Sequence, residues 1–206
     1  MNQPGAPADA KLDLRSQLLA ERLALSRAQR AQLDRRICAH VLRFMEQRPG
    51  SAISAFQPFR GEPDLTPALR LLHEAGRRVH LPVLVDDFMQ FRRWTPASVL
   101  TPNRFGIPEP RDGTACPPEN LDWVLMPLVA FSSAGTRLGM GGGYYDRSFA
   151  FCLDGSTPAR PLLIGVAYSL QEVNSLPAQS WDVPLDAILT DQGPRQFRPL
   201  AAEPPE

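Results

Sequence analysis

The segment WVLMPLVAFSSAGTRLGMGGGYYDR, residues 123–147, decides the fold of this chain. Residues 123–131 form its most apolar run, and four of its 14 glycines follow within residues 139–143. An apolar run, a glycine-rich loop and a helix-like segment, in this order, predict a buried strand that leads into a phosphate-binding loop. Glycine lacks a Cβ atom, so backbone N–H groups can turn inward and an anion can approach closely.

Two arginines flank the glycines, and each guanidinium group can donate two hydrogen bonds to phosphate oxygens. They are Arg137 and Arg147, and a helix that begins at Tyr144 would direct its positive end toward the same anion. The loop lacks the Lys-Ser/Thr pair of a P-loop, and its glycine spacing differs from GxGxxG. A glycine turn between a strand and a helix can also bind no ligand. The arginines, the paired tyrosines and Asp146 favour a nucleotide or phosphate-ester enzyme.

The composition is typical of one soluble globular domain. The chain has 206 residues, of which 43% are hydrophobic and 21% charged, with zero formal net charge and a pI near 6.8. This balance argues against nucleic-acid binding, which usually needs a basic face. No apolar run approaches the roughly 20 residues that span a bilayer, and we expect no signal peptide and no membrane contact. Three cysteines without a CxxC pair predict reduced thiols and a cytoplasmic location, and we expect a monomer.

Helical and extended patterns alternate along the chain. We expect helices over residues 9–25, 26–47, 66–75, 144–153 and 170–176, and strands over 51–56, 78–84, 89–94, 121–131, 161–168 and 187–190. Ser26 and Gln29 have the spacing of a capping box, which marks the start of the second helix. The alternation predicts a single three-layer α/β/α domain with a mainly parallel sheet over residues 9–191. Residues 1–8 are expected to be disordered, and residues 192–206 to form a polar tail.

Parallel sheets of this kind bind ligands at the carboxyl ends of their strands. We therefore expect the loops after Phe56, Trp94 and Phe131, and the segment near Asp186, to meet on one rim of the sheet. The proline-rich segment 95–120 is long for a connection without regular structure, which favours a function for it.

Charged residues form two candidate binding groups. Lys11 and Arg15 are four residues apart and share one helix face, where they either reach triphosphate oxygens or form a solvated surface. Glu62 follows the first strand, and it is either an ordinary loop acid or a carboxylate that binds the polar edge of a pteridine-like ring.

Two acids are candidates for magnesium, because Mg²⁺ bound to a nucleotide takes only one or two protein carboxylates. Asp146 starts a predicted helix and Asp186 precedes the last strand, with Asp182 as a competitor for the role of Asp186. Phe105 lies in the long irregular segment, where it either stacks on a flat heterocycle or packs on the domain.

Several short motifs follow one another in order between residues 11 and 190. They are KxxxR (11–15), FRGEPD (59–64), FRRW (91–94), FGIPEP (105–110), MPLVAF (126–131), GxRLGxGxGYYDR (135–147) and WDVPLD (181–186). This order resembles that of the 5-formyltetrahydrofolate cyclo-ligase family, whose members are also called 5,10-methenyltetrahydrofolate synthetases.

The resemblance implies an ATP- and Mg²⁺-dependent ring closure of a reduced folate. It would convert 5-formyltetrahydrofolate to 5,10-methenyltetrahydrofolate, with ATP as co-substrate and ADP and phosphate as products. The formyl oxygen takes the γ-phosphoryl group, and the neighbouring anilinic nitrogen then attacks the formyl carbon as phosphate leaves. Phosphoryl transfer depends mainly on positioning and charge stabilisation. The resemblance also implies a fold similar to that of the sugar-phosphate isomerase and CoA-transferase group.

The site residues implied by the resemblance form four sets. Catalysis is assigned to Lys11, Arg137 and Tyr144. The nucleotide set is Lys11, Leu12, Asp13, Leu14, Arg15, Arg137, Leu138, Gly139, Met140, Gly141, Gly142, Gly143, Tyr144 and Tyr145. The folate set is Gln57, Glu62, Phe105, Met140, Gly141, Gly142, Gly143 and Tyr144. The magnesium set is Asp146 and Asp186.

The chain departs from the family pattern at two positions. Ser132 stands where many members carry an acid, and Gly142 stands where some carry a basic residue that Arg147 or a backbone amide can replace. Two other classes of function stay open: a non-catalytic folate- or nucleotide-binding module with the same fold, and a phosphosugar or thioester-handling enzyme. Turnover separates the cyclo-ligase from the first, and ATP dependence separates it from the second.

Overall fold

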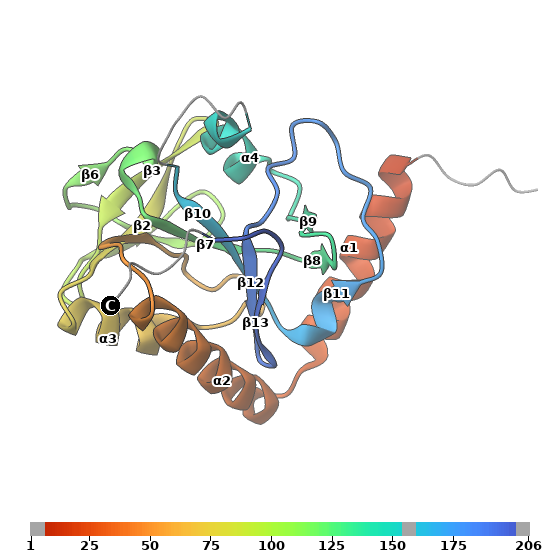
Figure 1. Ribbon diagram of the computed structural model, residues 1–206, viewed down its shortest axis with the longest axis horizontal. Helices are drawn as coiled ribbons and strands as arrows, with labels where there is room; N and C mark the ends of the chain where they lie inside the picture. Colours follow the sequence, from red (N-terminus) through yellow and green to blue (C-terminus); the bar gives the residue numbers. More distant parts are fainter. Residues whose placement is uncertain (1–6, 154–159, 201–206) are drawn as a thin grey trace, which may run out of the picture.

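A mixed α/β fold with one large, mostly parallel sheet is seen in the computed structural model, which describes residues 7–153 and 160–200 (Figure 1). The sheet has eight strands in the order β13-β12-β10-β7-β1-β2-β3-β6. They are β1 (Ala52–Ser54), β2 (Arg78–Val85), β3 (Phe88–Arg93), β6 (Ala115–Cys116), β7 (Trp123–Pro127), β10 (Leu162–Val166), β12 (Ala187–Thr190) and β13 (Gly193–Gln196). The strands from β12 to β2 run parallel, whereas β13, β3 and β6 add antiparallel edges. The predicted α/β class and the mainly parallel sheet are confirmed, and the likeness to the isomerase and CoA-transferase group stays a prediction.

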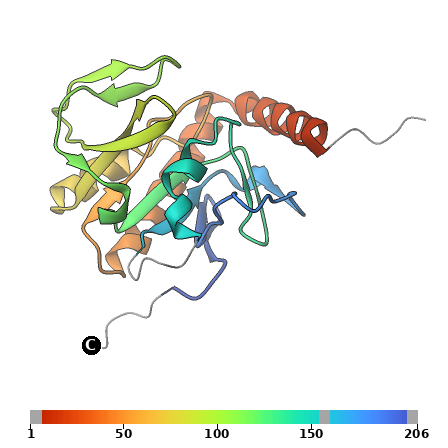
Figure 2. The ribbon, with the colours of Figure 1, turned by 90° about the horizontal axis from the view of Figure 1, so that it is seen from above.

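Both faces of the sheet are covered, which explains why the central strands β7 and β10 are apolar without interruption. Alternate residues of β7 and β10 pack into two separate cores: Leu125 and Ile164 in one, Val124 and Leu163 in the other. The helices α2 (Arg27–Glu46) and α3 (Thr66–Glu74) cover the first face. The short helix α4 (Tyr144–Ser148) and the 3₁₀ turn η2 (Ala150–Cys152) cover the second, as Figures 1 and 2 show.

Helix α2 begins as the sequence predicts. The Ser26 hydroxyl accepts a hydrogen bond from the Gln29 backbone N–H, and the Gln29 side chain accepts one from the Ser26 backbone N–H. This reciprocal capping satisfies two N–H groups that a helix start otherwise leaves unpaired. Helix α1 (Pro7–Ala24) lies beside a small sheet of β11 (Glu172–Val173), β8 (Ala130–Ser132) and β9 (Arg137–Leu138) (Figure 1).

The strand predicted over residues 121–131 is divided in two. β7 ends at Pro127, and the chain then leaves the large sheet to form β8. At Leu128, side chains take the place of a neighbouring strand. Arg22 and Gln171 both donate hydrogen bonds to the Leu128 backbone carbonyl. The glycine loop therefore follows the β8–β9 hairpin and not the buried strand itself.

Other element boundaries also differ from the prediction. The proline-rich segment 95–120 contains a hairpin, β4 (Leu100–Pro102) with β5 (Pro108–Pro110), then β6 and the 3₁₀ turn η1 (Pro118–Asn120). The helix predicted over 170–176 is the 3₁₀ turn η3 (Ser169–Gln171) followed by β11, and the one predicted over 144–153 shortens to α4 and η2.

The domain bounds stay a prediction, and regular structure extends a few residues beyond them at both ends. Part of the expected polar tail, residues 193–196, forms the edge strand β13, whose exposed Pro194 and Arg195 are residue types that prevent pairing at a free sheet edge. At the other end α1 begins at Pro7, within the segment expected to be disordered. Residues 1–6 and 201–206 lie outside the described residues.

Candidate functional site

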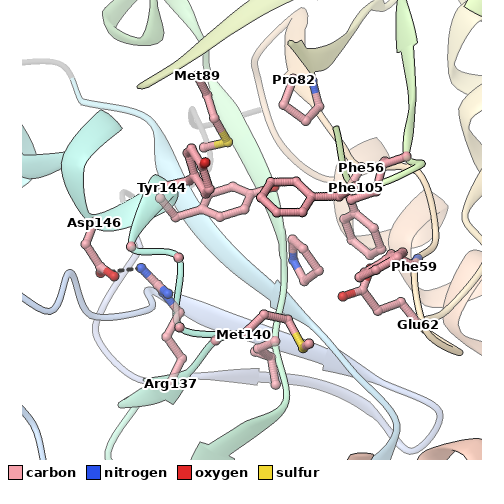
Figure 3. Close-up of a pocket in the computed structure, with 18 of the residues that line it drawn as sticks. Phe56, Phe59, Glu62, Pro82, Met89, Phe105, Arg137, Met140, Tyr144 and Asp146 are labelled. Carbon is pink, nitrogen blue, oxygen red and sulfur yellow. Dashed lines mark hydrogen bonds and ion pairs between the residues drawn. The ribbon is translucent and has the colours of Figure 1, made fainter. Parts of the chain in front are cut away.

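A pocket of about 590 Å³ lies at the carboxyl ends of β1, β2 and β7 (Figure 3). Segments that are distant in sequence line it: α1, the loop after β1, β2, Met89 of β3, the β4–β5 hairpin, and residues 127–128, 137–146 and 179–182. The segments after Phe56, Trp94 and Phe131 meet at this pocket as predicted, but β3 is antiparallel, so the chain after Trp94 reaches the pocket only through the β4–β5 hairpin. The functional residues therefore come from loops that a rigid parallel sheet holds in place.

The glycine loop forms one wall of the pocket. Gly141 and Gly143 have φ angles of +96° and +65°, in the left-handed region that favours glycine. A Cβ atom at Gly143 would lie 2.7 Å from a guanidinium nitrogen of Arg147. Helix α4 has only five residues, so the expected contribution of its positive end to an anion is small. Anion binding here depends on the backbone of the loop and on nearby cations.

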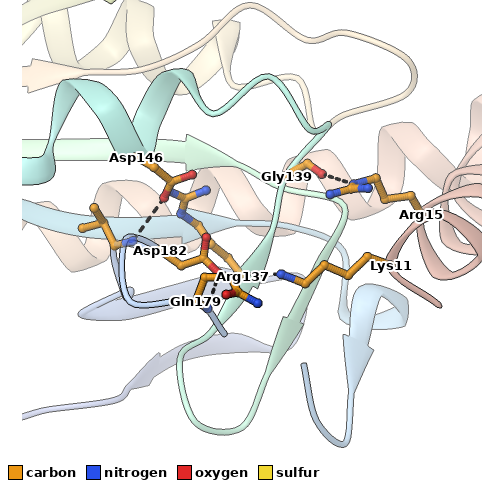
Figure 4. A network of polar contacts seen from close by, with 8 residues as sticks. Lys11, Arg15, Arg137, Gly139, Asp146, Gln179 and Asp182 are labelled. Atoms are coloured by element: carbon orange, nitrogen blue, oxygen red, sulfur yellow. Dashed lines mark hydrogen bonds and ion pairs between the residues drawn. The ribbon is translucent and has the colours of Figure 1, made fainter. Parts of the chain in front are cut away.

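Cations from α1 lie against this wall (Figure 4). The Arg15 Nε donates to the Gly139 carbonyl oxygen over 2.8 Å, and the Lys11 ammonium lies 3.8 Å from an Asp182 carboxylate oxygen. Arg137 pairs with Asp146 over 2.5 Å, and its side chain is only 6% exposed. The structure thus brings Lys11, Arg15 and Arg137 to one side of the pocket.

Three neighbours in the predicted nucleotide set lie elsewhere. Leu12 and Asp13 are exposed, and Leu14 packs against the small core that contains Leu18 and Leu138. A helix presents only about every third or fourth residue to one surface, so only Lys11 and Arg15 of this run line the pocket.

Glu62 lies on the opposite side of the pocket from the Arg137–Asp146 pair (Figure 3). It is 6% exposed, and burial raises the pKa of its carboxyl group to about 7, against the opposing effects of Arg22 and the Phe59 N–H. That N–H donates to the carboxylate over 3.0 Å. Gln57 lines the pocket in the same loop. A buried carboxylate in an apolar wall is suited to a ligand edge that carries N–H donors.

Aromatic side chains close the mouth of the pocket. Phe105, from the β4–β5 hairpin, meets the Tyr144 ring edge to face at 6.3 Å, and the Arg104 guanidinium contacts the Tyr144 hydroxyl. The Arg147 guanidinium lies 5.1 Å from the centre of the same ring. Met140 of the glycine loop also lines the pocket (Figure 3). Tyr145 faces the interior, and burial raises the pKa of its phenol, which keeps it a neutral hydrogen-bond donor.

The structure does not bring Asp186 to the pocket, so the expected pairing of Asp146 with Asp186 is corrected. Asp186 precedes the first residue of β12, which places it at the amino end of the parallel strands. It accepts a hydrogen bond from the Leu163 N–H over 2.8 Å and forms ion pairs with Arg160 and Arg198. The chain before β12 instead carries Asp182 past the pocket, where it faces Lys11.

Sequence reasoning missed Arg22 and Gln171. Both are fully buried, and both donate to the Leu128 carbonyl at the floor of the pocket. Arg22 lies eleven residues after Lys11, about three helical turns, so it shares a face of α1 with Lys11 and Arg15. This spacing was the feature of the sequence that could have placed Arg22 on the pocket side of α1. No comparable signal marks Gln171, whose partners at the pocket floor, Leu128 and Val129, are distant in sequence.

Comparison with known protein families confirms the resemblance seen in the sequence, along nearly the full chain. Residues 7–191 match the model of the 5-formyltetrahydrofolate cyclo-ligase family. A 5-formyltetrahydrofolate cyclo-ligase of Haemophilus influenzae is 35% identical over 181 residues, which cover 85% of this chain and 95% of the relative. The cyclo-ligase of Escherichia coli K12 is 34% identical over 174 residues, which cover 82% of this chain and 93% of the relative.

Two solved structures are also similar. The solution structure of the Aquifex aeolicus 5,10-methenyltetrahydrofolate synthetase has a TM-score of 0.79 and 32% identity, and the match covers 93% of this chain and 95% of that one. The Mycoplasma pneumoniae 5,10-methenyltetrahydrofolate synthetase has a TM-score of 0.71 and 30% identity, with 88% and 98% covered. In sequence and in fold, this chain belongs to the 5-formyltetrahydrofolate cyclo-ligase family.

Proposed function

We propose that this protein is an enzyme that converts 5-formyltetrahydrofolate to 5,10-methenyltetrahydrofolate, using ATP and releasing ADP and phosphate. The names of its relatives support the folate conversion. The observation that carries the proposal is the pocket with two different walls. A buried carboxylate, Glu62, lies on one side, and the glycine loop with Arg137, Arg15 and Lys11 lies on the other.

The two walls suit the two substrates. Glu62 and Gln57 bind the polar edge of the reduced pterin, and Phe105 and Tyr144 cover its flat ring. The triphosphate lies along the glycine loop, where backbone N–H groups and the three cations balance its charge. This arrangement directs the γ-phosphate toward the formyl group between the walls, so reaction becomes effectively intramolecular.

The proposed reaction has two steps. The formyl oxygen attacks the γ-phosphorus, the bond to the ADP oxygen breaks, and ADP leaves. The anilinic nitrogen then attacks the formyl carbon, loses its proton, and the C–O bond breaks to release phosphate and the methenyl product. Arg137 and Lys11 stabilise the negative charge that moves between oxygens in the first step. Tyr144 stays a catalytic candidate at the mouth of the pocket, where contacts with Arg104 and Arg147 hold its ring in place.

The carboxylates in the pocket fit a nucleotide-bound Mg²⁺ ion. Among residues 7–153 and 160–200, no group of three or more acidic, histidine or cysteine side chains could hold a metal alone. Asp146 and Asp182 supply two carboxylates, which suffices when phosphate and water provide the remaining ligands. When bound, the ion would neutralise phosphate charge. Asp146 also orients Arg137 through their ion pair, and Asp182 orients Lys11.

A continuous absorbance assay tests the proposal. Purified protein is mixed with 5-formyltetrahydrofolate, ATP and Mg²⁺, and the near-ultraviolet band of the methenyl product is followed. We expect the band to grow only when ATP is present. A flat trace from folded protein contradicts the enzymatic function, and binding of both ligands without turnover would favour the non-catalytic module.

Asp182→Asn is expected to raise the Mg²⁺ concentration for half-maximal activity by about tenfold or more, because the pocket loses one of its two metal-facing charges. Asp186→Asn is the matched control, since it removes an acid from the other end of the strands. We expect the Mg²⁺ requirement of that variant to match the wild type. Equal requirements in all three proteins would remove Asp182 from the metal site.

Location and assembly stay predictions. The part of the chain that the structure describes has no helix long and apolar enough to cross a membrane. A cytoplasmic location and a monomer are proposed on the grounds of composition and cysteine usage given above.

A further inference from the structure

Arg22 is a buried cation that the proposed reaction leaves without a role. It lies on α1, and its side chain is completely buried. Its Nε donates to the Arg60 carbonyl over 3.1 Å, and its Nη1 donates to the Leu128 carbonyl over 3.0 Å. Its Nη2 is buried and has no hydrogen-bond partner among the described residues. A buried charge that lacks a full set of partners is costly, so its presence calls for a compensating interaction.

The two carbonyls that Arg22 binds belong to the pocket. Arg60 lies two residues before Glu62, in the loop after β1, and Leu128 lies at the end of β7 on the pocket floor. Arg22 thereby joins α1, which carries Lys11 and Arg15, to the opposite wall. One side chain connects the two halves of the site.

The charge of Arg22 also acts on Glu62. No carboxylate lies within ion-pair distance of Arg22 in the described part of the chain, yet its charge favours the ionised form of Glu62 and opposes the effect of burial on that carboxyl. In return, Glu62 is the largest influence that opposes the lowering of the Arg22 pKa by burial. The interaction is therefore mutual, and it acts between two buried side chains, where water screens charge weakly.

Few other charged or titratable groups face this pair. Tyr145, on α4, interacts electrostatically with Glu62, and its raised pKa leaves it neutral. Arg30, on α2, and Tyr168, at the end of β10, interact with Arg22. The backbone N–H of Phe59 donates to Glu62. Among these groups, Arg22 is the one cation that acts directly on the Glu62 carboxylate.

We propose that Arg22 is a positioning residue for folate recognition, which holds the Glu62 loop against the pocket floor and places a positive charge near the Glu62 carboxylate. This inference rests on the proposed function, because it assigns Glu62 to the pterin. Arg22 does not touch the substrate; it acts through Glu62. A purely structural arginine would brace α1 and the loop without any effect on the charge of that carboxylate.

The test is a double-mutant cycle on folate binding. Dissociation constants for 5-formyltetrahydrofolate and, separately, for ATP are measured between pH 6 and 9 for wild type, Arg22→Gln, Arg22→Lys, Glu62→Gln and the Arg22→Gln/Glu62→Gln double variant. In the wild type we expect folate affinity to rise with pH as Glu62 ionises. In Arg22→Gln we expect the midpoint to move upward by about one pH unit, which weakens binding about tenfold below that midpoint.

Two controls distinguish an effect of Arg22 on the Glu62 carboxylate from a purely structural effect. Glu62→Gln abolishes the pH dependence, and adding Arg22→Gln to it is expected to change folate affinity less than twofold, because the effects of coupled residues are not additive. Arg22→Lys keeps the charge but loses the planar guanidinium that donates to both carbonyls, and we expect it to retain the wild-type midpoint. ATP affinity is expected to stay unchanged, since Lys11 and Arg15 remain in place.

Additive losses in the cycle, or a parallel loss of ATP and folate affinity, would overturn the inference. If Arg22→Gln does not fold, the two affinities of Arg22→Lys decide: a loss confined to folate supports the proposal, and a parallel loss of ATP and folate affinity contradicts it. If the wild type itself binds no folate, the proposed function fails instead, so the two failures are distinguishable.

Discussion

Arg137→Ala is expected to lower kcat of the ring closure by about 10²- to 10³-fold, a loss of about 2.7–4 kcal/mol of transition-state stabilisation. Arg137 lies at the start of the glycine loop with only 6% of its side chain exposed, so its charge acts in a partly dry environment. Charge moves between phosphate oxygens in the transition state, and a preoriented guanidinium stabilises that change. We expect the KM for folate to change little, because Glu62 lies on the other wall. Steady-state kinetics with each substrate varied in turn measures both quantities.

Arg147→Ala is the matched control for this prediction. Arg147 flanks the same loop, but its guanidinium donates to the Asp87 and Gly142 carbonyls and covers the Tyr144 ring. Its donors are engaged by the protein, so we expect a smaller loss than for Arg137. Equal losses in the two variants would mean that loop structure, and not transition-state charge, explains the Arg137 effect. Wild-type turnover in a folded Arg137→Ala protein would remove Arg137 from the site.

The features that the sequence predicted correctly depend on local patterns. The capping box at Ser26 and Gln29 needs only a spacing of three residues, and it is present. Lys11 and Arg15 share a helix face because of helix geometry alone, and both reach the pocket. Glu62 follows a short buried strand, and the rule on the carboxyl ends of strands places it at the site.

The errors arise where partners are distant in sequence. Asp182 and Asp186 are four residues apart, and only the point at which β12 begins decides which of them faces the pocket. The break after β7 depends on Arg22 and Gln171, which are 106 and 43 residues away from Leu128 along the chain. Strand β13 is a short polar edge, so it lacks the apolar pattern by which strands are detected.

Glu62→Gln is expected to weaken folate recognition and to stabilise the protein. Hydrogen bonds to a charged group contribute about 1.5–3 kcal/mol, so we expect the KM for folate to rise about 10- to 100-fold while the KM for ATP stays close to wild type. Glutamine keeps an oxygen that can accept from the Phe59 N–H, which limits structural change. A defect confined to ATP would contradict the assignment of Glu62 to the folate wall.

The stability effect follows from the pKa of Glu62, which rises from 4.5 to about 7 on folding because the carboxyl group is buried. Below pH 4.5 the group is protonated in both states and contributes no difference. Between pH 4.5 and 7 the unfolded chain releases the proton while the folded protein retains it, so the free energy of unfolding falls by about 1.4 kcal/mol per pH unit. Above pH 7 the full cost, about 3 kcal/mol, is present. Denaturant unfolding of the ligand-free protein should therefore show Glu62→Gln more stable than wild type at pH 8 and nearly equal to it at pH 4.5. A constant difference across this range would mean that Glu62 titrates normally in the folded protein. The predicted pattern would identify Glu62 as a carboxylate kept in the apolar wall at a cost in stability, which the bound pterin offsets by supplying N–H donors to its charge.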